Sequence, residues 1–445
     1  MEDFLDDLIA WLRIPSISAL PEHANDVHAA AVFTAGLFRK AGLENVGLIE
    51  GEGHPLVVGD WLHAPGKPTI LCYGHYDVQP AEPLHLWNTP PFEPTVLGDN
   101  LYARGAADDK GLAIILIKAV ERLRQQGPLP VNLRFLFEGE EESGGDHVSN
   151  YLRTHPEALA CDAALICDTE MFAPELPTLC VGLRGILYAE LEVQTGETDL
   201  HSGVYGGAVP NAIEAAARIV SSLKDLHGRI LIPGFYDDVA APTAEELASW
   251  ARLPFDAGAF QREEARVHAL TGEPGFGVLE RSWARPTFEI HGIRGGFTGP
   301  GAKTVIPCEA TVKFSCRLAP GQDPVRVGEL LNAAIEAAAL PGVRTQLKIL
   351  HSAKASVVDP ANPYVRKAAL AMTEVFGRET VLTRSGGSIP IVGLFAETLG
   401  VPSVLTGFGL PDDNLHAPNE KVYLPNIERG IEAIVRYWQS LGEAL

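Results

Sequence analysis

Histidine and acidic side chains that follow apolar segments form the most specific chemical pattern in this sequence. His75 and Asp77 close the apolar run 68–78. Residues two apart on extended backbone point to the same face, and a metal-binding histidine usually donates its second ring N–H to a carboxylate. The pair therefore predicts a metal ligand with its orienting acid. The alternative is a histidine at a strand end that faces solvent.

Four further segments carry side chains of the same kind. They are Asp108 and Asp109 in the glycine-rich turn 101–111, Glu138, Glu140, Glu141 and Glu142 after the apolar run 133–137, Asp168 after the run 163–167, and His416 in the loop that follows 401–406. One of the two aspartates could serve only as a helix N-cap, and a run of glutamates is usually a solvated face. Because ligands bind beyond the carboxyl ends of the strands in an open parallel sheet, we expect these side chains to meet at one edge.

Two histidines and three carboxylates gathered in this way would form a metal centre. This mixture suits Zn²⁺, with Mn²⁺ or Co²⁺ as alternatives. Five ligands exceed what one tetrahedral ion needs, but they fit two ions that share a bridging carboxylate and lie about 3.5–4 Å apart. The sequence therefore predicts a site for two divalent metal ions.

Several motifs around these residues follow one another in a fixed order. They are Gly-His75-Tyr-Asp77-Val-Gln-Pro, Arg-Gly-Ala-Ala-Asp108-Asp-Lys-Gly, Glu-Gly-Glu-Glu141-Glu142-Ser-Gly, Asp168, Asp-Leu-His201-Ser-Gly, Lys-Thr304-Val-Ile-Pro and His416-Ala-Pro-Asn-Glu. In this order they resemble the co-catalytic dinuclear zinc metallopeptidases, a family of dipeptidases, carboxypeptidases and deacylases. The resemblance is strongest to the branch of cytosolic non-specific dipeptidases and carnosinases, and it extends from about Phe4 to about Tyr437.

The resemblance implies a role for each metal-site residue. It makes Asp108 the bridging ligand, places His75 and Asp168 at one metal, and places Glu142 and His416 at the other. Two catalytic roles follow as well: Asp77 orients His75, and Glu141 is the general base for the attacking water. Members of this family often have a cis peptide bond after the bridging aspartate, here between Asp108 and Asp109.

The resemblance also implies residues that contact the substrate. His201 would come from the inserted domain of a partner subunit and stabilise the oxyanion. Arg317 would hold the substrate carboxylate with its guanidinium fork, and Thr304, Ser388 and Gly387 would add hydrogen bonds nearby. From composition alone, His201 is an ordinary loop histidine and Arg317 an ordinary surface ion pair. Asn362 is predicted to contact substrate, at a position where animal carnosinases carry a histidine.

The pattern of apolar residues predicts an α/β protein with two domains, because one core stops growing at about 250–300 residues. Residues 1–184 and 359–445 alternate strands with amphipathic helices, which is typical of a mostly parallel sheet flanked by helices. Residues 185–358 follow the order β-α-β-β-α-β of a ferredoxin-like unit. We therefore expect a discontinuous metal-binding catalytic domain and an inserted α+β domain that acts as a lid and forms a dimer.

Composition narrows the class of protein. The formal net charge of −22 and the pI near 5.0 argue against a nucleic-acid partner. We find no basic and apolar leader at Met1 and no apolar run of membrane-spanning length. The six cysteines show no Cys-x-x-Cys spacing and are expected to be buried free thiols. These features predict a cytoplasmic enzyme without a membrane partner.

Three functions remain open at this stage. The first is a metal-dependent dipeptidase that hydrolyses unblocked dipeptides, with Glu141 as the general base. The second is the same chemistry on an N-acyl amino acid or at the carboxyl end of a longer peptide, because the pocket rather than the fold decides the substrate. The third is a binding or regulatory homologue without catalysis, against which the intact Glu141 and the full ligand set argue.

Overall fold

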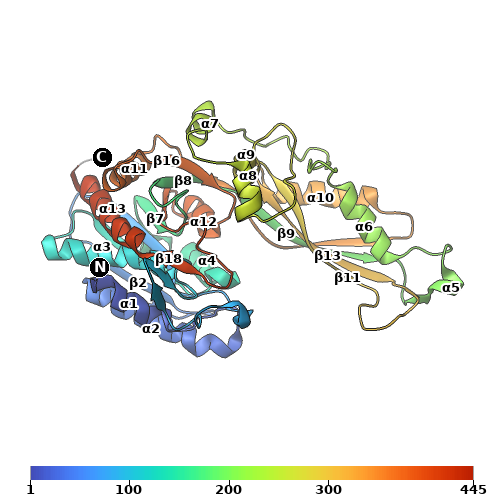
Figure 1. Cartoon of the computed structure of the whole chain (residues 1–445), viewed down its shortest axis with the longest axis horizontal. Helices are drawn as coiled ribbons and strands as arrows, with labels where there is room; N and C mark the ends of the chain where they lie inside the picture. The colour runs from blue at the N-terminus through green and yellow to red at the C-terminus, as the bar shows by residue number, and fades with distance from the viewer. Residues whose placement is uncertain (1, 444–445) are drawn as a thin grey trace.

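Two separate sheets organise the chain, and they lie side by side in Figure 1. The computed structural model describes residues 2–443. The larger sheet has nine strands and the smaller has four. The strands of the larger sheet all precede residue 184 or follow residue 355, whereas the four strands of the smaller sheet lie between them in sequence. The smaller unit is thus inserted into the larger one.

The strands of the larger sheet run in the order β1-β2-β6-β3-β7-β17-β8-β15, and β16 pairs with β8. The four central strands β6, β3, β7 and β17 pair in parallel, and their buried, continuous apolar runs are typical of strands covered on both faces. The strands span Glu44–Ile49 (β1), Leu56–Trp61 (β2), Thr69–His75 (β3), Asn132–Glu138 (β6), Ala163–Cys167 (β7), Thr178–Leu183 (β8), Ser356–Val357 (β15), Val381–Ser385 (β16) and Ser403–Thr406 (β17).

Helices cover both faces of this sheet and enclose two apolar cores. On one face lie α1 (Glu2–Leu12), α2 (Ala24–Ala41), α3 (Lys110–Gln126), α11 (Pro363–Phe376) and α13 (Leu424–Glu443), and on the other α4 (His147–Thr154) and α12 (Pro390–Thr398). Short 3₁₀ turns occur at Pro21–His23, Leu84–Leu86, Glu141–Ser143 and Pro156–Leu159. A small sheet of β4 (Thr95–Leu97), β5 (Asn100–Tyr102) and β18 (Lys421–Tyr423) joins the two loops that carry Asp108 and His416. The α/β class predicted from the sequence is confirmed.

The inserted unit is a four-stranded antiparallel sheet with the order β11-β13-β9-β14. Its elements are β9 (Gly185–Gln194), α6 (Ala212–Ser222), β11 (Thr287–Gly295), β13 (Glu309–Leu318), α10 (Pro324–Ala338) and β14 (Arg344–Ala353), which is the order of a ferredoxin-like unit. Helices α6 and α10 pack on one face and form a separate core with it. At the far end of this unit, β10 (Leu200–His201) pairs with β12 (Val305–Ile306) and leads into α5 (Ser202–Tyr205) (Figure 1).

Residues 232–285, here called the connecting segment, join the inserted unit to the catalytic domain. Their short helices are α7 (Ala244–Trp250), α8 (Ala257–Ala259), a π-helical turn (Phe260–Glu264) and α9 (Val278–Trp283). Glu246 of α7 forms a buried ion pair with Arg384 of β16, with an Nη2–Oε1 distance of 2.7 Å. Trp250 packs in one apolar cluster with Val381 of the same strand. The segment therefore belongs to the inserted stretch of sequence but packs on the large sheet.

Two further observations concern the cysteines and the length and polarity of the helices. All six cysteines are free thiols, and none is paired in a disulfide. Within residues 2–443, every helix is too short or too polar to cross a membrane.

Candidate metal centre

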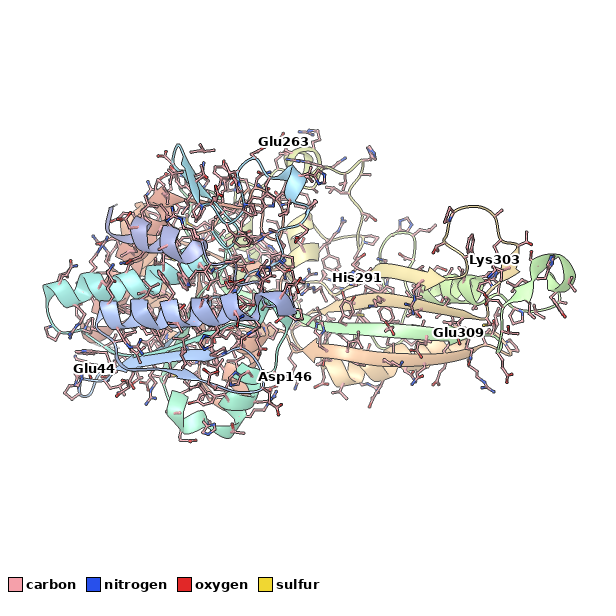
Figure 2. All side chains as sticks on the ribbon, turned by 90° about the horizontal axis from the view of Figure 1, so that it is seen from below. Glu44, Asp146, Glu263, His291, Lys303 and Glu309 are labelled. Carbon is pink, nitrogen blue, oxygen red and sulfur yellow. The ribbon has the colours of Figure 1, made fainter. Side chains whose placement is uncertain are left out.

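A cleft with a volume of about 1780 Å³ lies between the catalytic domain and the inserted unit. Its lining includes acidic residues at the carboxyl ends of strands in the large sheet and Arg317 and His351 from the inserted sheet. Figure 2 shows His291 near the end of the inserted sheet that lies next to the catalytic domain. The cleft therefore brings residues of both units to one solvent-accessible space.

The first group of ligand atoms contains His75, Asp108 and Asp168, and these atoms all lie within 4.8 Å of one another. His75 ends β3 and Asp168 directly follows β7, two neighbouring parallel strands. The Nε2 atom of His75 lies 3.1 Å from Oδ1 of Asp108. The parallel pairing of the strands thus accounts for the meeting of two residues that lie far apart in sequence.

The second group contains Asp108, Glu142 and His416, again within 4.8 Å. The Nε2 atom of His416 lies 2.9 Å from Oδ2 of Asp108 and 3.2 Å from Oε2 of Glu142. Asp108 is common to the two groups and presents a different carboxylate oxygen to each histidine. The peptide bond from Asp108 to Asp109 is cis, as the family resemblance predicts.

The chemistry of this cluster fits divalent cations. His75 is fully buried, and its Nε2 atom makes no hydrogen bond in the described part of the chain, although a buried polar atom normally has a partner. Burial raises the pKa of Asp168, and the neighbouring carboxylates of Asp109 and Asp108 raise it further. Burial also opposes ionisation of Asp108, but a hydrogen bond with His416 and the close contact with the ring of His75 hold its pKa below the usual range. Two cations would neutralise these crowded acids and use the free Nε2 atom.

Asp77 lies behind His75 and outside both ligand groups. The Nδ1 atom of His75 is 3.3 Å from Oδ1 of Asp77. The other carboxylate oxygen of Asp77 accepts hydrogen bonds from Ser18 Oγ at 2.6 Å and from the backbone N–H of Glu142 at 3.1 Å. Asp77 therefore connects a residue of the first group with the loop that carries a residue of the second.

Glu141 also lines the cleft but belongs to neither ligand group. Burial raises the pKa of its carboxyl group to about 7, with His75 opposing the shift and the acids Glu142 and Asp108 adding to it. A carboxyl group whose pKa lies near neutrality can both accept and donate a proton at physiological pH. Glu141 therefore has the position and the acidity of a proton-transfer group.

Arg317, Gly387 and Ser388 line the same cleft as the acidic residues. Arg317 lies on β13 and donates a hydrogen bond from Nη1 to Ser388 Oγ at 2.8 Å. No carboxylate of residues 2–443 forms an ion pair with Arg317, so the expectation of an ordinary surface ion pair finds no partner here. A guanidinium that faces a cleft without an acid is a suitable site for a carboxylate ligand.

The other three predicted residues lie away from the cleft of their own chain. His201 and Thr304 occupy the far end of the inserted unit, where the backbone N–H of Ser202 donates to the carbonyl of Thr304. Figure 2 shows the neighbouring Lys303 at this end. Asn362 caps α11 by accepting a hydrogen bond from the backbone N–H of Tyr364 at 3.0 Å, and it is absent from the cleft lining. This position does not support a contact between Asn362 and the substrate, because the side-chain oxygen already accepts a hydrogen bond at the start of α11.

Sequence reasoning assigned no role to Glu420 and Arg104, which support the loop of Asp108. The buried carboxylate of Glu420 accepts hydrogen bonds from the backbone N–H groups of Gly105, Ala107 and Asp108, at 3.0, 2.8 and 3.0 Å. It also pairs with Nη1 of Arg104 at 2.6 Å. The only available signal was the position of Glu420 at the end of the His416 motif, since the two loops are more than 300 residues apart.

Comparisons with known proteins agree with this geometry. Residues 71–440 match the model of peptidase family M20/M25/M40. The Cys-Gly metallodipeptidase of Schizosaccharomyces pombe is 33% identical over 99% of this chain and 96% of its own length. The solved structure of the M20 family metallo-carboxypeptidase Sso-CP2 from Sulfolobus solfataricus has a TM-score of 0.88 and 31% identity, with 100% of each chain covered. That of human carnosine dipeptidase 1 has a TM-score of 0.85 and 28% identity, covering 100% of this chain and 96% of the other. The chain belongs to peptidase family M20/M25/M40. It is therefore a metallopeptidase, and the family predicted from the sequence is confirmed.

Proposed function

We propose that this enzyme hydrolyses the peptide bond of dipeptides whose two ends are free. The observation that carries this proposal is one cleft lined by members of both ligand groups, by Glu141 and by Arg317, which forms no ion pair within residues 2–443. Relatives of similar length bear the names Cys-Gly metallodipeptidase and Beta-Ala-His dipeptidase, with 33% and 29% identity. A free dipeptide carries both a carboxylate that Arg317 could bind and a peptide bond that the acidic cluster could act on.

The metal-site residues act as ligands and supports in this proposal. His75, Asp108 and Asp168 would hold one divalent ion, and Asp108, Glu142 and His416 would hold the other. We propose Zn²⁺ as the native metal because histidine and carboxylate ligands suit it, with Mn²⁺ or Co²⁺ as alternatives. Such ions lower the pKa of a water molecule and polarise the substrate carbonyl when bound. Asp77 fixes the ring of His75 by contacting the Nδ1 atom of that ring.

Glu141 carries the proton in the proposed reaction. Its carboxylate removes a proton from the attacking water, and the resulting carboxylic acid gives that proton to the nitrogen of the leaving amine as the C–N bond breaks. Arg317 binds the carboxylate at the other end of the dipeptide, assisted by Ser388 and the backbone at Gly387. This arrangement fixes the direction in which the substrate lies and places its peptide bond beside Glu141.

We further propose that two chains form a symmetric dimer through the inserted unit, so that His201 and Thr304 reach the cleft of the partner. Support comes from the exposure of both residues and from their absence from the cleft lining of their own chain. His201 directly precedes α5, which lies at the end of the inserted unit away from the large sheet (Figure 1). A histidine at that position in the partner could stabilise the oxyanion that develops on the substrate carbonyl. We also propose a cytoplasmic location, which six free thiols support.

A metal-supplemented activity screen tests the proposed substrate class. The purified enzyme is incubated with free dipeptides, their N-acetylated and C-terminally amidated forms, and tripeptides, and the released amino acids are measured. Glu141→Gln serves as the matched inactive control. Rapid hydrolysis of free dipeptides alone supports the proposal.

The carboxypeptidase and deacylase reactions form the second candidate. The volume of the cleft, about 1780 Å³, exceeds the roughly 300–1,000 Å³ of common small-ligand pockets and leaves room for a longer peptide. The similarity to the metallo-carboxypeptidase Sso-CP2 also favours this candidate. If tripeptides or N-acetylated amino acids are hydrolysed faster than free dipeptides in the same screen, the result would favour the carboxypeptidase or deacylase reaction.

A further inference from the structure

Arg184 joins three segments behind the residues that line the cleft. It lies between β8 and β9, where the chain leaves the large sheet for the inserted unit. Its Nε atom donates to the carbonyl of Gly386 at 3.0 Å, and Nη1 donates to the carbonyls of Arg285 and Arg281 at 3.2 and 3.4 Å. The side chain thus binds the loop 385–388 of the catalytic domain and the end of the connecting segment together.

The same residue fixes the hydroxyl that contacts Arg317. Ser388 Oγ donates its proton to the backbone carbonyl of Arg184 at 2.5 Å, so its oxygen is left to accept from Arg317 Nη1 at 2.8 Å. A hydroxyl has one proton, and this proton is already used. The direction of the bond between Ser388 and Arg317 is therefore set by Arg184.

Close packing leaves the loop little freedom around this side chain. A Cβ atom added to Gly386 would lie 2.7 Å from the carbonyl oxygen of Ser282 and 2.9 Å from Nη2 of Arg184. The backbone N–H of Arg184 also donates to the carbonyl of Gly387 at 3.2 Å. The position of the loop therefore follows the position of Arg184.

The guanidinium groups of Arg184 and Arg317 also determine the charge in this region. Within the part of the chain that the structure describes, no carboxylate forms an ion pair with either Arg184 or Arg317. Burial and the nearby positive charge of Arg317 together lower the pKa of Arg184 to about 10, and Glu289 opposes this shift. Arg317 therefore presents a positive charge to the cleft of a protein whose formal net charge is −22, and this charge attracts an anionic group.

We propose that Arg184 is a positioning residue for carboxylate recognition: it holds Ser388 and Arg317 in the geometry that binds the free carboxyl end of the substrate. This inference rests on the proposed function, in which Arg317 binds that carboxylate. Arg184 itself lies outside the lining of the cleft and acts through its two neighbours. Its side chain also couples the position of the connecting segment to the geometry of this site.

The experiment compares Ala-Ala with its C-terminal amide as substrates of the metal-loaded enzyme. The measured quantity is the preference, defined as the ratio of kcat/KM for the free dipeptide to kcat/KM for the amide. Arg184→Met is expected to reduce the preference about tenfold, mainly through KM, as for a misplaced charged hydrogen-bonding group. Arg184→Lys is expected to remain impaired, because an ammonium group cannot reproduce the guanidinium fork. Metal content should stay unchanged in both variants.

A double-mutant cycle separates positioning from general destabilisation. Arg317→Met should abolish the preference, and adding Arg184→Met should lower it no further, because the two residues act as one unit. Arg252→Met is the matched control, since Arg252 also joins the connecting segment to the catalytic domain, through an exposed ion pair with Glu379. It should leave the preference unchanged. Equal losses on both substrates in Arg184→Met, or full recovery in Arg184→Lys, would overturn the inference.

Binding measurements keep this test independent of turnover. Calorimetry with Ala-Ala and its amide is performed on metal-loaded Glu141→Gln, with and without Arg184→Met. Suppose that the wild type hydrolyses no dipeptide, but that Arg184→Met removes the preference for binding Ala-Ala over its amide. This result would refute the proposed function and support the inference. A protein that retains Arg184 and binds the two ligands equally overturns the inference, whatever substrate the wild type hydrolyses.

Discussion

The carboxylate of Glu420 accepts a hydrogen bond from the backbone N–H of Asp108 at 3.0 Å. Asp108 is the one residue that both ligand groups share, and Glu420 lies four residues after His416, a ligand candidate of the second group. Glu420 therefore ties together the two loops that must keep a fixed distance for two metals to bind.

Replacing Glu420 by glutamine should weaken both metal sites. The amide group would present N–H donors to backbone N–H groups, so the loop of Asp108 would lose acceptors that it now has. We expect metal affinity to fall by about 10–100-fold, the usual effect of losing a residue that supports metal ligands. Competition with a chelator measures the affinity, and the exposed Glu93→Gln is the control. Unchanged affinity at both sites in a folded Glu420→Gln protein would contradict this role.

Glu141→Gln should separate binding from catalysis. The glutamine keeps the size of the side chain but cannot accept a proton from water. Turnover should fall by about 10²–10⁴-fold, the usual contribution of a general base, while metal content and dipeptide affinity remain. Steady-state kinetics and calorimetry provide the two readouts. Turnover close to that of the wild type would remove Glu141 from the mechanism.

Metal binding should release protons and strengthen as the pH rises. Hydrogen bonds with Asp108 and Glu142 raise the pKa of His416 to about 10 in the metal-free protein. Burial lowers the pKa of His75, but the neighbouring acids Asp108 and Asp77 outweigh it and raise that pKa. His416 is thus protonated at neutral pH and must lose a proton before it binds a metal, so affinity is lower at low pH.

Calorimetry in buffers with different ionisation enthalpies measures this proton release. We expect protons to be released at pH 7 when both metals bind, with His416 among their sources, because metal ligands must be deprotonated. His416→Ala should reduce the number. An affinity that does not change with pH would show that the ring of His416 is already neutral.

Mixing two inactive variants tests the proposed dimer. His201→Ala and Glu141→Gln should each lose activity, with a loss of about 10²-fold or more for His201 if it stabilises the oxyanion. In a mixed dimer, one cleft would contain a wild-type Glu141 and receive a wild-type His201 from the partner. Activity should therefore partly return after subunit exchange. Verified mixed dimers without any recovery would mean that His201 acts within its own chain or takes no part in the reaction.

The sequence predicted most of the elements that position the metal centre. His75 and Asp168 follow strands whose continuous apolar runs mark them as buried neighbours, and parallel pairing brings their ends together. Helix α2 and strand β13 likewise carry buried apolar residues at regular intervals along their whole length. Regular periodicity was informative wherever an element packs against a core along its whole length.

Features that depend on distant contacts were less predictable. The stretch 232–285 contains several short helices, and residues of α7 and α9 pack with Val381 of β16 rather than forming a long periodic pattern of their own. Glu420 and Arg184 act through backbone groups far away in sequence, and no local pattern marks such a contact. Asn362 stands at a helix start, where capping accounts for its side chain.

Metal stoichiometry tests the central claim most directly. Chelator-treated protein is titrated with Zn²⁺ while bound metal and hydrolysis of a free dipeptide are followed, for the wild type and for Asp108→Asn. The shared position of Asp108 predicts two ions per chain at saturation, recovery of activity on metal addition, and weaker binding at both sites in the variant. A wild-type enzyme that saturates with one ion per chain, or a variant that loses only one site, would contradict a centre bridged by Asp108.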